Sequence, residues 1–511
     1  MVQVSRREFL AATAAAGLLS HAAGSNSAEP QAVGAPNASK LTTCSATELA
    51  SLICQQKVSS QTVVEAYIKR IKQINPVIKA VVDTAFDKAQ HEAQLADDAI
   101  RQGTADWKRQ PLLGVPVTIK DAFDVAGMPT TCGVPRLRNK CAEADATAVR
   151  KLKEAGAIIL GKTNVPALCM HFETDNSVYG QTKNPYDLAR TPGGSSGGEA
   201  AIIAAGGSPL GLGSDGGGSI RTPAHFCGVA GIRPGWGRVS LAGSFPPPPR
   251  AYGNYYTAGP LARYVEDLAL ALRILSGPDP RDPFTFPVPL LDYREVKLEN
   301  LRVAFWTKYE PAETTKETRE TVEKAAADMQ MIGAHVEEEC PPHWDKVYGI
   351  LQAVYDQEIA TFEDVLKEFG VDVPTSVDRA AIAYAKRHAG KLRADQAKMA
   401  TGDWLPMFQI AMLEFFEKYD GLLCPVSAGP AVRHAESWNR VDDFGFTLGT
   451  SLIPKVPAGS VRCGWSPERL PIGVQVVTKP YREDITLAIM RQLESTFGGW
   501  DAPPEDNFRS P

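Results

Sequence analysis

Between residues 111 and 239, short strand patterns alternate with helical ones, and this alternation constrains the fold more than any other feature of the chain. In "LLGVPVTIKDAF" apolar residues recur with a period of two, and the predicted strand ends at Lys120. "ATAVRKLKEAG" and "GGEAAIIAAGG" are helical patterns closed by glycine, and "AIIL" and "SPLGLGSD" are short buried strands. Strands that alternate with helices in this way predict an α/β sheet.

The regions on either side are predicted to be mostly helical. In "TVVEAYIKRIKQINP" apolar residues recur at helical spacing, and we expect Pro76 to end this helix. Residues from about 279 to 300 are rich in proline and aspartate and predict a surface loop. The segment from about 315 to 420 is charged and mainly helical, with little strand signal, and predicts a cover on the sheet. "GVQVVTKPYREDITLAIMRQLESTFGGW" predicts one more strand and one more helix.

The first 28 residues have the outline of a secretory signal. "VSRREFLAATAAAGLLSHAAG" begins with Arg6 and Arg7, continues with small apolar residues, and reaches small-x-small cleavage sites around Ala22 to Ala28. The arginine pair resembles a twin-arginine export signal. We therefore expect residues 1–28 to be a signal peptide, residues 29–40 to be a linker, and the mature protein to be periplasmic or secreted after a transient encounter with the twin-arginine export machinery.

Charge and cysteine content exclude several classes of protein. The net charge of −5 gives no basic face for nucleic acid. The nine cysteines are odd in number and scattered, without a C-x-x-C pair, so neither a disulfide framework nor a metal knuckle is predicted. We expect no metal and no organic cofactor.

The stretch "GAIILGKT", Gly156 to Thr163, fits the phosphate-loop pattern G-x-x-x-x-G-K-[ST]. A phosphate loop needs a strand, then a glycine-rich turn, then a helix. Here a helix precedes Gly156, the four variable positions are apolar and strand-like, and Pro166 disfavours a helix directly afterwards. The pattern therefore predicts a structural strand that carries Lys162, and not a nucleotide site.

Two glycine- and serine-rich loops carry the strongest chemical signal. The first, Gly193 to Gly198, opens a helix, and the second, Asp215 to Ser219, follows a strand. Glycines let the backbone approach a ligand closely, and consecutive N–H groups can converge on a developing oxyanion. A serine at the end of such a run can attack a carbonyl carbon if a base accepts its proton.

One alternative uses the first loop as an α/β-hydrolase nucleophile elbow, because Gly194, Ser196 and Gly198 satisfy G-x-S-x-G. That site needs a strand before the loop and a late histidine. "NPYDLARTP" before the loop does not have a strand pattern. The late histidines His343, His388 and His434 stand in polar helical or loop contexts. We keep this interpretation as a minor alternative.

Taken together, the motifs resemble the amidase signature family from about Leu41 to Trp500. The segments "GVPVTIKDAFDVAGMPTTCG", "GAIILGKTNVPA", "NPYDLARTPGGSSGGEAA", "GSDGGGSIRTPAHFCGVAGIRP" and "LPIGVQVV" match in order. The resemblance implies one α/β domain over residues 41–511, with a large mixed sheet sandwiched between helices.

The same resemblance implies a Ser-cisSer-Lys triad. Carried over position by position, the lysine is Lys120, the bridging serine is Ser195 and the nucleophile is Ser219. The family places the bridge 24 residues before the nucleophile, which selects Ser195 over Ser196 (219 minus 195). The N–H groups of Gly216, Gly217, Gly218 and Ser219 would form the oxyanion hole. Three residues, Cys169, Met170 and His171, stand where relatives line the acyl pocket.

Elementary chemistry agrees with these roles. Lys120 can act as a base only when neutral, and burial disfavours its charge. Neutral Lys120 would take a proton from Ser195, and Ser195 one from Ser219, which attacks the amide carbon. The sequence thus predicts an amidase with a small-molecule amide substrate and an acyl-Ser219 intermediate. An A subunit of a tRNA-dependent amidotransferase and a non-catalytic binding protein stay open as alternatives, and so does a homo-oligomer.

Overall fold

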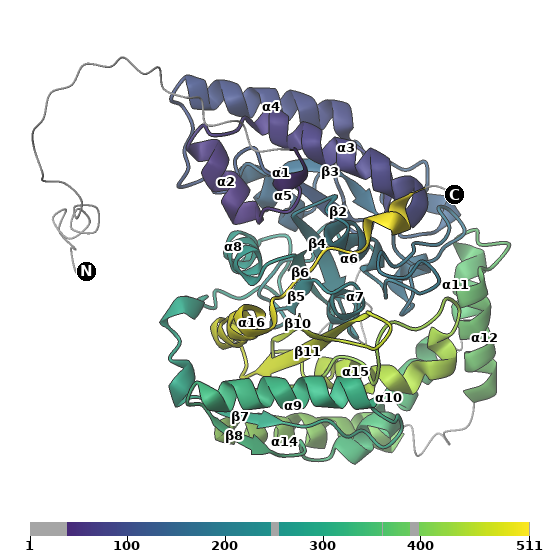
Figure 1. Ribbon diagram of the computed structural model, residues 1–511. Helices are drawn as coiled ribbons and strands as arrows, with labels where there is room; N and C mark the ends of the chain where they lie inside the picture. Colours follow the sequence, from purple (N-terminus) through teal and green to yellow (C-terminus); the bar gives the residue numbers. More distant parts are fainter. Residues whose placement is uncertain (1–37, 247–254, 360, 389–397, 510–511) are drawn as a thin grey trace, which may run out of the picture. The chain divides into compact units, whose positions relative to one another are not determined.

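The computed structural model describes residues 38–246, 255–359, 361–388 and 398–509. Within these residues, eleven strands form one sheet (Figure 1). From one edge to the other the strands are β1 (Val81–Thr84), β3 (Ile158–Thr163), β2 (Pro116–Lys120), β4 (Leu210–Asp215), β6 (Thr257–Ala262), β5 (Ala230–Arg233), β10 (Ala458–Trp465), β11 (Pro471–Thr478), β9 (Gly421–Pro425), β7 (Arg302–Phe305) and β8 (His335–Glu338).

The sheet is mixed. Strand β2 pairs in parallel with β3 and β4, and β7 pairs in parallel with β8 and β9. The other neighbours are antiparallel. The expected α/β fold with a large mixed sheet is therefore confirmed.

Helices cover both faces of this sheet. They are α1 (Ala38–Leu41), α2 (Ala46–Cys54), α3 (Ser60–Ile78), α4 (Phe86–Arg101), α5 (Thr147–Glu154), α6 (Gly197–Ala204), α7 (Arg221–Phe226), α8 (Val265–Leu275), α9 (Lys316–Met331), α10 (Trp344–Ile359), α11 (Phe362–Glu368), α12 (Ser376–His388), α14 (Leu405–Lys418), α15 (Gly445–Ser451) and α16 (Glu483–Phe497). Helices α8, α16 and α9 form a continuous row along one face, and α6 and α7 pack on the other (Figure 1).

The central strands are buried along their whole length. Every residue of β2, β3, β4, β6, β9 and β11 is buried. A strand covered on both faces needs apolar or small residues at successive positions, as "AIIL" and "SPLGLGSD" provide. Every residue of α6 is buried too, and a Cβ on Gly198 would lie only 2.4 Å from the backbone nitrogen of Asn164. The small residues of α6 thus let it lie directly on the sheet.

The segment from 315 to 420 differs from its prediction in one respect. It holds α9, α10, α11, α12 and α14, but also the edge strand β8 (Figure 1). Strand β8 is short and no residue in it is fully buried, so its sequence carries little hydrophobic periodicity. Helix α3 also runs past Pro76 to Ile78, where Lys79 adopts a left-handed conformation.

The expected signal peptide, residues 1–28, and most of the expected linker, residues 29–40, lie outside the described residues. None of the helices in the described part of the chain is both long enough and apolar enough to span a bilayer.

Candidate active site

Lys120 is the last residue of β2 and is fully buried. Its Nζ donates hydrogen bonds to Ser195 Oγ at 2.7 Å and to Ser214 Oγ at 2.8 Å. Burial lowers the pKa of Lys120, and nearby thiols and the Asp215 carboxylate oppose this shift only in part. In its neutral form, an amine in this position can accept a proton from the hydroxyl that it contacts.

Ser195 is buried in the first glycine loop, directly before α6. The Gly194–Ser195 peptide bond is cis. A Cβ on Gly194 would lie 2.5 Å from the carbonyl oxygen of His171, so only glycine fits between the two chain segments. The absence of a side chain at this position lets Ser195 reach the amine of Lys120.

The second glycine loop is organised by Asp215, the last residue of β4. Its carboxylate accepts hydrogen bonds from the N–H groups of Gly218 at 2.7 Å and Ile220 at 3.1 Å, and from the Arg221 guanidinium at 2.9 Å. Burial alone would raise the pKa of Asp215, but the guanidinium of Arg221 outweighs it and holds this pKa well below its usual range. The expectation for Gly218 needs correction, because its N–H already donates to Asp215.

Ser219, Gly216 and Gly217 line a cavity of about 140 Å³. The N–H of Ser196 donates to the carbonyl oxygen of Ser219 at 3.1 Å, so the two glycine loops are tied together next to Ser195. The Ser219 side chain is half-buried, and within the described residues its hydroxyl makes no hydrogen bond. That hydroxyl therefore stands at the cavity wall.

The three predicted pocket residues Cys169, Met170 and His171 line the same cavity. Cys169 Sγ lies 3.5 Å from Cys132 Sγ. A hydrogen bond from Cys132 and the charge of Lys120 lower the pKa of Cys169 to about 7, although burial acts in the opposite direction. This thiol is thus electrostatically coupled to Lys120.

His171 connects the cavity wall to the helical cover. Its Nδ1 accepts a hydrogen bond from Trp438 Nε1 at 3.0 Å, and its Nε2 lies 2.8 Å from Asp378 Oδ1. Because an indole nitrogen only donates, the His171 proton resides on Nε2 and is donated to Asp378, near the start of α12. His171 therefore positions α12.

Sequence reasoning missed two polar partners of the site. Ser214 accepts from Lys120 and also from the hydroxyl of Tyr256 at 2.6 Å. Ser214 directly precedes Asp215, and its contact with Lys120 depends on the pairing of β2 with β4, which the sequence pattern does not show. Tyr256 had no signal either, because only the paired strands β4 and β6 bring it close.

The structure argues against the phosphate loop at Gly156 to Thr163 and against the nucleophile elbow at Ser196. Lys162 is fully buried within β3, 3.1 Å from Asp121 Oδ1, and donates to the carbonyl oxygen of Pro129 at 3.0 Å, so it cannot hold a phosphate. Ser196 is buried and its hydroxyl donates to the carbonyl oxygen of Ser214 at 3.2 Å. Among the described residues, no histidine is hydrogen-bonded to a serine of either loop, as an α/β-hydrolase site would require.

Comparison with known proteins agrees with this architecture. A family model described as Amidase matches residues 62–487. Fatty-acid amide hydrolase 2 of Homo sapiens is 34% identical, with 89% of this chain and 89% of that protein covered. The A subunit of the glutamyl-tRNA(Gln) amidotransferase of a Sulfurihydrogenibium species is 31% identical, with 88% and 96% covered. The solved structure of 6-aminohexanoate cyclic dimer hydrolase in complex with substrate superposes with a TM-score of 0.78 at 26% identity and covers 92% of this chain and 100% of its own.

The family match spans most of the chain, the sequence relatives align over most of their own length, and the solved hydrolase shares the fold. The chain therefore belongs to the amidase family, and hydrolysis of a carboxylic amide is the activity that this membership supports.

Proposed function

We propose that the protein hydrolyses a carboxylic amide with Ser219 as nucleophile, Ser195 as proton bridge and Lys120 as base. One observation carries the assignment: the fully buried Lys120 amine donates to Ser195 Oγ at 2.7 Å and, among the described residues, forms no ion pair with a carboxylate. An amine in such surroundings is a base, because its charged form is poorly solvated.

In the acylation step, Ser219 Oγ attacks the amide carbon while its proton passes to Ser195 Oγ. Ser195 passes its own proton to Lys120 Nζ. Collapse of the tetrahedral intermediate breaks the carbon–nitrogen bond, and the proton returns along the same chain to the leaving nitrogen. Ammonia or an amine departs, and the acyl group stays as an ester of Ser219.

Water then attacks the ester carbon while the same relay accepts its proton. The bond to Ser219 Oγ breaks, the proton returns along the relay to Ser219 Oγ, and the carboxylic acid departs. In both steps negative charge develops on the carbonyl oxygen, and the backbone N–H groups of Gly216, Gly217 and Ser219 are the donors we assign to it. Gly218 supports the oxyanion hole indirectly, because its N–H donates a hydrogen bond to Asp215 and so holds the second glycine loop in place.

The acyl part of the substrate would enter the cavity beside Ser219. Most of its wall is apolar, from Leu168, Met170, Phe172, Leu351, Leu448 and Leu452. A cavity of this character favours an aliphatic or aryl stem over a polar one.

We also propose that the protein acts outside the cytoplasm. The support is the sequence of residues 1–28, in which Arg6 and Arg7 precede an apolar run and small-residue cleavage sites. Replacing both arginines with lysine should leave the precursor in the cytoplasm. Recovery of processed protein from the periplasm of that variant would refute the export route.

Two other functions can be separated from this one. An amidotransferase A subunit is supported by identities of 31% to 33% to several such subunits, and it would act with partner subunits. A binding protein would use the glycine loops without turnover. The purified chain alone should hydrolyse simple amides, which neither alternative predicts.

A fluorophosphonate probe tests the nucleophile directly. It should label the wild-type protein at Ser219 and should not label Ser219→Ala, while Ser196→Ala, in the same pair of loops, should still be labelled. Failure to label the wild type, or labelling that persists in Ser219→Ala, would overturn the proposal.

A further inference from the structure

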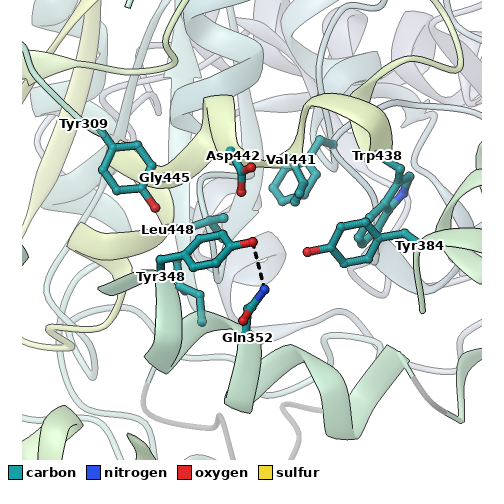
Figure 2. Close-up of a pocket in the computed structure, with 11 residues that line it drawn as sticks. Tyr309, Tyr348, Gln352, Tyr384, Trp438, Val441, Asp442, Gly445 and Leu448 are labelled. Carbon is teal, nitrogen blue, oxygen red and sulfur yellow. Dashed lines mark hydrogen bonds between the residues drawn. The ribbon is translucent and has the colours of Figure 1, made fainter. Parts of the chain in front are cut away.

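A second, smaller cavity, drawn in Figure 2, shares lining residues with the catalytic one. It is bounded by α10, which contributes Tyr348 and Gln352, by α12, which contributes Tyr384, and by the 3₁₀ segment η6 (Ser437–Phe444), which contributes Asp442. Its volume is about 30 Å³, compared with about 140 Å³ for the catalytic cavity. This is room for a group about the size of one or two waters.

Oxygen atoms converge on this cavity. Figure 2 shows the hydroxyl ends of Tyr309, Tyr348 and Tyr384 turned toward the same space as the carboxylate of Asp442. Gln352 Nε2 donates to the Tyr348 hydroxyl at 2.8 Å, which orients the amide at the floor of the cavity. A phenol oxygen can accept a hydrogen bond even when its own proton is donated elsewhere. The wall of this cavity is mostly apolar, and its polar groups are three phenols, the Gln352 amide and one carboxylate.

Asp442 is the acidic residue that lines this cavity. Its side chain is half-buried, and within the described residues no lysine or arginine forms an ion pair with it. Burial raises the pKa of the Asp442 carboxyl, and the charge of His388 offsets this only in part. A carboxylate that has lost water without gaining a cationic partner gains most from a ligand that brings one.

The two cavities share one wall. Phe172, Leu351, Trp438 and Leu448 line both of them. In the proposal below, a ligand with its carbonyl carbon at Ser219 would run along these apolar side chains to reach the oxygens around Asp442.

We propose that the small cavity binds a primary ammonium group at the far end of the acyl chain of the substrate. The inference rests on the proposed function and specifies its substrate class: amides of ω-amino acids. Three N–H donors of an ammonium match the convergent oxygens, and its volume matches the cavity, whereas a trimethylammonium or an aryl group is too large. An apolar stem between the reactive amide at one end and the ammonium at the other matches the apolar wall that the two cavities share.

The test compares pairs of acyl para-nitroanilides of graded length. In each pair, one acyl chain ends in an ammonium and the other in a methyl group of the same size. At the best length, the wild type should hydrolyse the ammonium member with a kcat/KM about tenfold higher than its methyl partner, which is the worth of one hydrogen bond to a charged group. A wild type that prefers the methyl member at every length would overturn the proposal.

Variants assign the preference to Asp442. Asp442→Asn keeps the size and removes the charge, and should lower kcat/KM for the ammonium member about tenfold more than for its methyl partner. Asp364→Asn removes the same charge from an exposed position on α11 and should leave the ratio as in the wild type. If Asp442→Asn lowered kcat/KM equally for the ammonium and the methyl substrate, the assignment to Asp442 would be contradicted.

A binding measurement separates this inference from the proposed chemistry. Calorimetry with Ser219→Ala should show the ammonium member of a pair binding about tenfold more tightly than the methyl member, whether or not the wild type turns either over. Equal affinities for the two members would contradict the ammonium site alone. Unequal affinities together with no turnover by the wild type would contradict the amidase mechanism alone.

Discussion

Two fully buried lysines on neighbouring strands, Lys120 on β2 and Lys162 on β3, differ in their polar partners. Lys162 lies 3.1 Å from the carboxylate of Asp121 and also donates to a carbonyl oxygen. Lys120 donates to the hydroxyls of Ser195 and Ser214 and, within the described residues, is not paired with a carboxylate. Burial alone thus does not make a base, and what distinguishes Lys120 from Lys162 is that no carboxylate forms an ion pair with it among the described residues.

The largest effect should come from Lys120→Met, which removes the base at nearly constant side-chain length. We expect kcat to fall roughly ten-thousandfold, because both acylation and deacylation lose their proton acceptor. Steady-state kinetics on the best amide measure this. The melting temperature should fall only modestly, because two hydrogen bonds to buried serines are lost but no ion pair is broken. Retained activity would remove Lys120 from the mechanism.

The matched substitution at the other lysine should act on stability. Lys162→Met leaves Asp121 buried without its cation and should lower the free energy of unfolding by about 3 to 5 kcal/mol, as for other broken buried pairs. Urea denaturation of the two methionine variants side by side measures the contrast. Equal destabilisation by both would contradict the difference we draw between the two lysines.

A third change makes the surroundings of Lys120 resemble those of Lys162. Ser214→Asp places a carboxylate against the amine, favours the ammonium and should reduce kcat/KM about tenfold to a hundredfold at neutral pH. Activity should recover as the pH rises, because the neutral base returns. Ser214→Asn, of the same size and uncharged, is the control, and an equal loss at all pH values in both variants would mean that shape and not charge is responsible.

The smallest effect concerns Cys169. Its thiol and that of Cys132 raise the pKa of Lys120 slightly against the dominant influence of burial. Cys169→Ala should therefore move the rising limb of kcat/KM against pH toward lower pH, by less than about one unit. The pH profile of the variant measures this, and a shift toward higher pH would show that the thiol does not act through its charge.

Local pattern was sufficient for the elements that hold the site. The strand ending at Lys120, the helix after the first glycine loop and the strand before Asp215 all follow from short-range periodicity and glycine placement. The same local pattern correctly predicts that the apolar residues of the phosphate-loop motif form a strand, which is β3. The family resemblance, and not local pattern, was needed to choose Ser195 over Ser196.

Contacts between residues far apart in the sequence could not be predicted from local sequence pattern. Ser214, Tyr256 and the Asp378–His171 contact depend on strand pairing and on the packing of the cover, which leave no periodic trace. Gly218 shows the same limit at short range: its place in a glycine run suggested an oxyanion donor, but the carboxylate three residues earlier takes its N–H. Edge strand β8 was missed because it is too exposed to show a hydrophobic pattern.

The most direct test is the titration of the Lys120 amine by NMR in protein with isotope-labelled lysine side chains, with Lys120→Met to assign the signal. The account predicts a pKa for Lys120 well below the ordinary value of about 10.4, and a midpoint that coincides with the rise of kcat/KM as the pH increases. A Lys120 that stays protonated up to its ordinary pKa while the enzyme is fully active at neutral pH would contradict it.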